Sequence, residues 1–279
     1  FNINQKYLKN FIVSCKQHYY DNPYHNFLHG FSVLHVSYLV LRKTSYIKYF
    51  TDLDIFSTLT AALCHDLEHP GLTNAYQVNS QSDLALRYND KSVLENHHAH
   101  VASVLLKKPN CLITNKLNIE QKQEFRKSII SIILHTDMTH HNDIVSKLSN
   151  IVEKLRSPNS TPTTQTNIND NDKQFISDSL VHLSDLSNPV LSWEQSKQWS
   201  LRVIDEFINQ SILEKKQGLP VASFMQNKDK NTISKVQISF IDYIVEPLWY
   251  NAKLIVPELD LQLNQLAINR QNWLEYPKL

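Results

Sequence analysis

The sequence predicts an all-α fold, a compact multi-helix bundle. The chain has three glycines among 279 residues, which disfavours a turn-rich β fold because glycine supplies many of the sharp turns in such folds. Apolar residues recur at helical spacing along most of the chain, and we find neither a run of alternating strand pattern nor a repeat. Hydrophobic residues make up 42% of the sequence, enough for a substantial core. We therefore expect one domain over residues 1–279.

The expected helices follow one another along the chain. Apolar side chains three or four residues apart lie on one face of a helix, and several such stripes are present. The first five comprise Tyr7, Phe11 and Cys15; Phe31, Leu34, His35, Tyr38, Leu39 and Leu41; Leu59, Ala62 and Leu63; Val101, Val104 and Leu105; and Phe125, Ile129, Ile132 and Ile133. Further helices are expected over residues 175–183, 194–212, 235–251 and 259–279.

One polar segment interrupts these helices. Residues 157–172 read SPNSTPTTQTNINDND and offer almost nothing to bury. This composition is typical of an inserted surface loop. We expect a flexible loop at about residues 157–173 that takes no part in a site.

Charge and cysteine usage limit the possible partners and compartments. The net charge of +1 predicts neither a nucleic-acid partner nor contact with a membrane surface. Cys15, Cys64 and Cys111 are odd in number and far apart, which is typical of reduced thiols in an intracellular protein. The chain begins at Phe1 without a signal peptide and has no apolar run of about 18 residues. We expect a cytoplasmic domain cut from a longer protein.

Histidines and acids gather in patterned groups. The chain has 13 histidines, and the segments YHNFLHG, HDLEH, LENHHAH, HTDMTHH and HLSDLSNP hold most of them. His25 and His29 are spaced i, i+4, as on one helix face, and His65 and His69 repeat that spacing. Asp66 follows His65 directly after the apolar residues 59–64, of which we expect residues 61–64 to be the buried end of a helix.

These groups predict a metal site more readily than a structural role. A lone histidine on a helix is usually a solvated or hydrogen-bonded residue, and we read His18, His35, His100 and His140 in that way. Imidazole and carboxylate together bind Zn²⁺, Fe²⁺ or Mn²⁺. Burying several such groups without a metal would carry a desolvation cost. No cysteine joins a cluster, so a structural zinc finger is not expected.

In these motifs, the chain resembles the catalytic domain of eukaryotic class I cyclic nucleotide phosphodiesterases. The resemblance spans residues 24–249 and rests on six motifs in the family's order: YHNFLH, HDLEHPGLTN, LENHH, HTDMTHH, HLSDLSNP and QISFIDYIVEPLW. It implies a helical bundle of the HD-domain type with a two-metal site. It also implies hydrolysis of a 3′,5′-cyclic nucleotide to the 5′-monophosphate, by in-line attack of a hydroxide that bridges the metals.

The resemblance implies roles for the residues of the metal motifs. His29, His65, Asp66 and Asp185 are similar to the ligands of the tighter metal, usually Zn²⁺, and Asp66 would also reach a second metal, Mg²⁺ or Mn²⁺, ligated mainly by water. His25 resembles the general acid that protonates the departing 3′ oxygen, a role that suits an imidazole. Residues that would orient His25 or the metal waters are Glu95 and His69, with Asn74, His98 and Asp137 as weaker candidates.

The same resemblance implies a pocket for the nucleotide base. Gln237 would hydrogen-bond the purine edge, Phe240 would stack on the base, and Val203 would cover its other face. Without the motif, Phe240 and Val203 would be read as ordinary helix core. The remaining pocket wall would comprise Tyr24, Met138, Asn188, Trp199 and Ser200.

Three positions depart from the family's pattern. Gly30 and Ser184 stand where the family often has alanine, and Ser239 stands where it usually has glycine. All three changes exchange one small residue for another and remove no inferred ligand. They bear on the shape of the pocket rather than on its chemistry.

Several functions remain open on the sequence. A sensor that binds cyclic nucleotide without cleaving it is disfavoured because His25 and the metal ligands are present. A nucleotidase is disfavoured by Gln237 and Phe240, and a purely structural protein would not need this array. An amide can face adenine or guanine according to how it is held, so cyclic AMP, cyclic GMP and dual specificity stay open, with a slight lean to cyclic AMP from Asn188. Regulatory or membrane segments of a longer parent protein also stay open.

Overall fold

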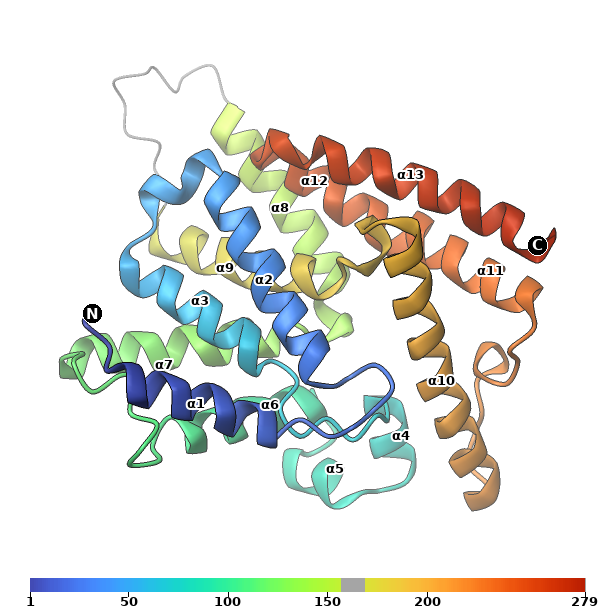
Figure 1. The fold of residues 1–279 in the computed structure, drawn as a ribbon, viewed down its shortest axis with the longest axis horizontal. Coiled ribbons are helices and arrows are strands. Elements are labelled where there is room, and N and C mark those ends of the chain that lie inside the picture. The colour runs from blue at the N-terminus through green and yellow to red at the C-terminus, as the bar shows by residue number, and fades with distance from the viewer. Residues whose placement is uncertain (157–168, 279) are drawn as a thin grey trace.

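The computed structural model describes residues 1–156 and 169–278, and over these ranges it contains helices and no strand (Figure 1). The α-helices of the first half are α1 (Gln5–Gln17), α2 (Phe27–Lys43), α3 (Asp52–Cys64), α4 (Asn74–Asn79), α5 (Asp83–Tyr88), α6 (Val93–Leu105) and α7 (Ile119–Leu134). Those of the second half are α8 (His141–Arg156), α9 (Asp170–Asp185), α10 (Trp193–Gln217), α11 (Lys230–Phe240), α12 (Glu246–Ile255) and α13 (Asp260–Glu275).

Short 3-10 helices lie between the longer ones: η1 (Ser45–Tyr49), η2 (Met138–His140), η3 (Asn188–Val190), η4 (Ser223–Met225) and η6 (Pro257–Leu259). A further 3-10 helix, η7 (Tyr276–Lys278), follows α13. Between α11 and α12 the chain instead forms a π-helix, η5 (Ile241–Val245). A π-helix is rare, occurs mostly as a single turn within an α-helix, and is frequently found at functional sites. The predicted all-α fold is confirmed.

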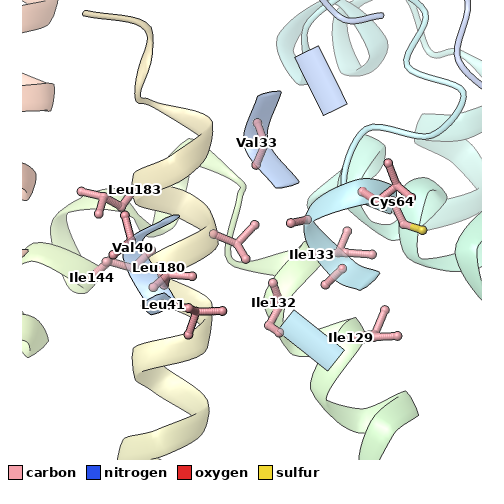
Figure 2. Close-up of a cluster of buried hydrophobic side chains, with 14 of the residues drawn as sticks. Val33, Val40, Leu41, Cys64, Ile129, Ile132, Ile133, Ile144, Leu180 and Leu183 are labelled. Atoms are coloured by element: carbon pink, nitrogen blue, oxygen red, sulfur yellow. The ribbon is translucent and has the colours of Figure 1, made fainter. Parts of the chain in front are cut away.

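The core lies where α2 and α9 cross α3, α7 and α8 (Figure 2). Its buried side chains include Val33, Val40 and Leu41 of α2, Cys64 of α3, Ile129, Ile132 and Ile133 of α7, Ile144 of α8, and Leu180 and Leu183 of α9. Burial of each large aliphatic side chain contributes about 1.5–3 kcal/mol. This packing fixes the ends of α2, α3 and α9 relative to one another, and those ends carry the inferred metal ligands.

Polar caps decide where these helices begin. Thr51 and Asp54 form a capping box at the start of α3, and Asn169 forms one with Asp172 at the start of α9. The predicted loop at about residues 157–173 is wrong at its end, because residues 170–173 form the first turn of α9. The rest of that predicted loop, residues 157–168, lies outside the described residues.

Two helix-face expectations are wrong. Helix α2 begins at Phe27 because the side chain of Asn26 accepts hydrogen bonds from Leu28 and His29, so His25 precedes the helix. Helix α3 ends at Cys64, and the backbone of Glu68 takes a left-handed conformation (φ 58°), so His65 and His69 do not share a helix face. All four histidines nevertheless lie either along one cavity, as His25 and His69 do, or in the cluster beneath it.

Three further observations concern single residues and the surface. All three cysteines are buried and free, with the sulfurs of Cys15 and Cys64 3.8 Å apart. A Cβ at Gly30 would lie 2.4 Å from the Tyr19 hydroxyl, so this position of α2 has no room for alanine beside Tyr19. None of the described helices has the length and apolar character needed to cross a membrane.

Candidate metal centre and substrate pocket

Four side chains from the ends of two helices and from the segment after a third meet in one cluster. His29 projects from the first turns of α2, His65 and Asp66 follow the last residue of α3, and Asp185 is the last residue of α9. One donor atom from each lies within 4.8 Å of all the others. The Nε2 atom of His29 is 2.9 Å from Asp185 Oδ1 and 3.3 Å from Asp66 Oδ2. The structure thus brings together all four residues predicted to hold the tighter metal.

The local chemistry fits a divalent cation. The Nδ1–H of His65 donates to the carbonyl of Ala62 (2.9 Å), which leaves Nε2 as the free donor for a metal. The buried atoms His65 Nε2 and Asp66 Oδ2 have no hydrogen-bond partner among the described residues. Two imidazoles and two carboxylates form a donor set suited to Zn²⁺ or a similar ion. The cluster can therefore hold a metal.

The electrostatics of the cluster also favour a bound cation. Burial lowers the pKa of His65, but Asp66 and Asp185 outweigh it and raise that pKa well above the usual range. Burial likewise opposes ionisation of Asp66, yet His65 and His29 hold its pKa well below the usual value. The carboxylates of Asp66 and Asp185 thus stabilise a positive charge within the cluster. A divalent cation can supply that charge in place of the histidine protons.

A second group lies beside Asp66. The donor atoms of Asp66, His69 and His98 lie within 4.8 Å of one another. Burial is the main reason that the pKa of His69 is well below its usual value and that of His98 is about 4. Both rings are neutral at pH 7 and do not repel a cation. This is the place where Asp66 could reach a second metal.

The His25 ring is held by a residue that sequence reasoning missed. The backbone N–H groups of Tyr24 and His25 donate to Glu206 Oε1 (2.8 and 2.7 Å), and His25 Nδ1 lies 2.6 Å from Glu206 Oε2. Burial opposes the charge on Glu206, but the hydrogen bond from His25 lowers its pKa below the usual value. The His69 ring stacks on the His25 ring with centroids 3.7 Å apart. Glu206 and His69 together fix the direction of the remaining His25 nitrogen.

Glu95 contacts Asn74 and not His25, so of its two predicted roles only the orientation of metal waters stays a prediction. Both oxygens of Glu95 accept hydrogen bonds from the Asn74 amide (3.1 and 2.9 Å). Burial, and then the charge of Asp137, raises the pKa of Glu95 to about 7. Among the described residues, the carboxylate that orients His25 is therefore Glu206 and not Glu95.

The spacing of residues along α10 is the sequence signal that could have identified Glu206 as a site residue. Trp199, Val203, Glu206 and Gln210 recur at helical intervals and share one face of α10. Trp199 and Val203 were predicted pocket residues, so an acid three residues after Val203 would face the same cavity. The contact with His25 spans 181 positions of sequence, and no motif records it.

The metal cluster and His25 open into one cavity of about 870 Å³. All eight residues predicted for substrate binding line it: Tyr24, Met138, Asn188, Trp199, Ser200, Val203, Gln237 and Phe240. Glu95, Asn74, His98 and Asp137 line it as well. Further lining residues that were not predicted include Glu206, Phe207 and Ile244. The structure therefore brings every predicted site residue to the cavity or to the metal cluster beneath it.

Hydrogen bonds orient two amides in this cavity. Ser200 Oγ donates to Gln237 Oε1 (2.9 Å), and both residues are buried. The Asn188 amide nitrogen donates to the Tyr24 hydroxyl oxygen (2.5 Å). Of the departures from the family's pattern, Ser239 lines the cavity, whereas the Ser184 hydroxyl donates to Leu180 within α9. The polar groups are arranged around an otherwise apolar wall, as in a pocket for a flat ring.

Comparison with known proteins agrees with this geometry. The family model for 3′,5′-cyclic nucleotide phosphodiesterases matches residues 24–266. The chain belongs to this phosphodiesterase family. The match covers all six motifs, and it confirms the resemblance inferred from the sequence.

Relatives of this phosphodiesterase chain come from distant eukaryotes. It is 38% identical to 3′,5′-cyclic-nucleotide phosphodiesterase regA of Dictyostelium discoideum, over 100% of this chain and 34% of regA. It is also 38% identical to the probable 3′,5′-cyclic-AMP phosphodiesterase pde-4 of Caenorhabditis elegans, over 97% of this chain and 40% of that protein. The chain thus spans about a third to two fifths of these relatives.

A solved structure has the same fold. The phosphodiesterase domain of the RhoPDE fusion protein from the choanoflagellate Salpingoeca rosetta superimposes with a TM-score of 0.93 at 36% identity, covering 99% of this chain and 85% of that one. The helical bundle described above is therefore the fold of a phosphodiesterase domain.

Proposed function

We propose that this chain hydrolyses a 3′,5′-cyclic nucleotide to the 5′-monophosphate. The observation that carries the proposal is a single cavity with the His/Asp cluster at its floor, the His25–Glu206 pair beside it, and an aromatic and amide-lined wall beyond. This order of groups matches a substrate with an anionic phosphodiester, a ribose and a planar base.

The proposed cofactors are two divalent metals. His29, His65, Asp66 and Asp185 would hold Zn²⁺, and Asp66 with its neighbours His69 and His98 would face Mg²⁺ or Mn²⁺. When bound, such a metal pair supplies a Lewis acid for the phosphoryl oxygens and lowers the pKa of water. Elemental analysis of the purified protein, compared with an Asp185→Asn variant, identifies the tighter metal.

The residues of the chain would assist the departure of the 3′ oxygen. Water attacks phosphorus in line with the P–O3′ bond and releases one proton to solvent, that bond breaks, and His25 Nε2 donates a proton to the leaving oxygen and is reprotonated from solvent. Glu206 accepts from His25 Nδ1 and from two backbone N–H groups, and so keeps Nε2 toward the phosphate. His69, stacked on the His25 ring, restricts its rotation.

Cyclic AMP is the substrate that we favour. The Asn188 amide nitrogen is engaged by Tyr24, which leaves its oxygen to accept from the amino group of adenine. The Gln237 oxygen is engaged by Ser200, which leaves its amide nitrogen to donate to a ring nitrogen of adenine. The Caenorhabditis elegans relative and a 39% identical Drosophila melanogaster relative are both named cyclic-AMP phosphodiesterases. Phe240 and Val203 would cover the two faces of the base.

Initial rates of hydrolysis of cyclic AMP and cyclic GMP, measured side by side with Mg²⁺ and trace Zn²⁺, test the proposal. A higher kcat/KM for cyclic AMP is expected. Equal rates, or a preference for cyclic GMP, would refute the substrate assignment and leave the reaction class standing. Binding of cyclic nucleotide without turnover would favour a sensor, and release of phosphate from 5′-AMP would favour a nucleotidase.

A further inference from the structure

The walls at the base end of the cavity come from the short helix η3 and from the junction of α11 with the π-helix η5. One wall carries Asn188, the first residue of the three-residue helix η3. The other carries Gln237 and Phe240 at the end of α11, followed at once by the π-helix η5, whose Ile244 also lines the cavity. Short 3-10 and π-helices are less stable than α-helices. Their positions therefore depend on what holds them from outside.

Helix α13 lies outside the cavity and contacts both segments. It packs along α11 and α12 and against η3 (Figure 1). The Ser234 hydroxyl of α11 donates to the Trp273 carbonyl of α13 (2.6 Å), which fixes α13 beside the start of the Gln237 wall. No residue of α13 lines the cavity itself.

Asn269 of α13 holds the Asn188 wall. This side chain is fully buried, and its amide nitrogen donates to the carbonyls of Pro189 (2.8 Å) and Leu191 (2.7 Å). Its oxygen accepts from Gln265 (3.0 Å), so donors and acceptor are all used. Pro189 lies inside η3 and Leu191 ends it, so Asn269 fixes the backbone on which Asn188 stands.

The next residue, Arg270, holds the opposite wall. Its Nε and Nη2 atoms donate to the two carboxylate oxygens of Asp242 (2.6 and 2.8 Å). Asp242 is the second residue of η5 and lies two positions after Phe240. A bidentate guanidinium–carboxylate pair fixes orientation as well as distance. Arg270 therefore ties the start of the π-helix, and with it Phe240, to α13.

We propose that Asn269 and Arg270 are positioning residues that hold the two walls of the base pocket at a fixed separation and so set the affinity for the purine. Adjacent residues on one helix reach opposite walls, so α13 acts as a clamp across the base end. Both residues lie beyond residue 266, where the family model ends. The kinetic part of this inference rests on the proposed cyclic nucleotide hydrolysis.

Substitution at the half-exposed Arg270 tests the clamp. Arg270→Gln removes the bidentate pair, and Lys253→Gln is the matched control because it removes another ion pair to α13, the one with Asp260, away from the cavity. Expected for Arg270→Gln is a KM for the preferred cyclic nucleotide raised about threefold or more with kcat nearly unchanged, because the base wall binds ground state and transition state alike. The charge swap Asp242→Arg with Arg270→Asp should restore part of the KM.

Several kinetic outcomes would overturn the inference. An unchanged KM in Arg270→Gln would show that the pair does not support the pocket. A loss of kcat with unchanged KM, or equal effects in Lys253→Gln, would indicate general destabilisation. Melting temperatures of both variants, measured alongside, show whether their overall stability has changed by a similar amount.

Hydrogen exchange tests the clamp without any turnover. Arg270→Gln should speed amide exchange in residues 237–245, Asn269→Ser should speed it in residues 188–191, and Lys253→Gln should change neither. The same exchange in all three variants and in the unchanged protein would overturn the clamp. If the unchanged protein hydrolyses no cyclic nucleotide, the proposed function fails, while the exchange result still decides the clamp.

Discussion

Glu206 is the residue whose placement only the folded chain discloses. Its carboxylate accepts three hydrogen bonds from Tyr24 and His25 and lies almost fully buried against them. A buried carboxylate that receives three donors is held in one orientation, and the ring that it contacts is held with it. A single imidazole nitrogen is thus directed at the cavity above Asp66 and Asp185.

The proton-transfer role makes a prediction for two neighbouring variants. His25→Ala should retain its metal and lose about a hundredfold or more of kcat, as expected for a lost general acid. Glu206→Gln should lose about ten- to a hundredfold of kcat with little change in KM, since it acts through His25. Asp205→Asn is the control, because Asp205 pairs with Lys228 at the surface. A Glu206→Gln variant with normal kcat would contradict the role.

The raised pKa of Glu95 predicts that the free energy of unfolding of the metal-free protein depends on pH. Burial and Asp137 raise its pKa from 4.5 to about 7. The folded state therefore binds this proton more tightly than the unfolded chain does, and the free energy of unfolding should fall as pH rises from 4.5 toward 7. Glu95→Gln should flatten the decline of melting temperature over that range. Parallel profiles for both proteins, measured in chelator, would show that Glu95 ionises freely.

At the scale of elements, helix termini carry the chemistry. His65 and Asp66 follow the end of α3, Asp185 ends α9, and His29 lies in the first turns of α2. The chain can change direction where a helix ends, so side chains from distant segments can converge there without interrupting a helix. The buried faces of the same helices form the core of Figure 2, which fixes these ends in place.

The contact of Gly30 with Tyr19 makes a prediction for the α2–α3 region. A Cβ at position 30 would lie 2.4 Å from the Tyr19 hydroxyl, which donates to the Leu63 carbonyl (2.9 Å) just before His65. Gly30→Ala should destabilise the fold by about 1–3 kcal/mol, the usual cost of overpacking. The double variant Tyr19→Phe with Gly30→Ala should recover part of that loss in chemical denaturation. Additive losses would mean that the two sites are independent.

At the scale of the whole molecule, the metal cluster joins separate parts of the chain. His29, Asp66 and Asp185 are contributed by α2, by the segment after α3, and by α9. A cation bound to them would connect these elements, and a ligand that binds only the folded state stabilises that state.

The chain spans only part of its curated relatives. Four expectations therefore stay predictions: cytoplasmic location, the lack of nucleic-acid contacts, the lack of membrane contacts, and further regulatory or membrane segments.

Metal removal should therefore change both stability and rate. Treatment with a strong chelator is expected to abolish hydrolysis and to lower the melting temperature by several degrees, on the order of 2–4 °C for each kcal/mol lost in a domain of this size. Addition of Zn²⁺ and Mg²⁺ should restore both. The Asp185→Asn variant should show no such response to chelator or metal. An unchanged melting temperature in chelator would mean that the cluster holds no tight metal.

Motifs and periodicity predicted the fold class from the sequence, and they predicted which residues the structure brings together at the His/Asp cluster and along the cavity. They did so because helical spacing is local, and because the order of the His and Asp motifs identifies the family. Apolar spacing failed where a local polar cap sets the helix boundary: Asn26 starts α2 after His25, and the Asn169–Asp172 box starts α9 inside the expected loop.

Only the tertiary structure decided which groups support the reacting ones. Glu206 reaches His25, Tyr19 occupies the space beside Gly30, and Arg270 reaches Asp242 across long stretches of sequence. Each of these contacts joins two separate segments whose relative position follows from packing of the whole core. Propensity and spacing describe one helix at a time, so they carry no information on such contacts.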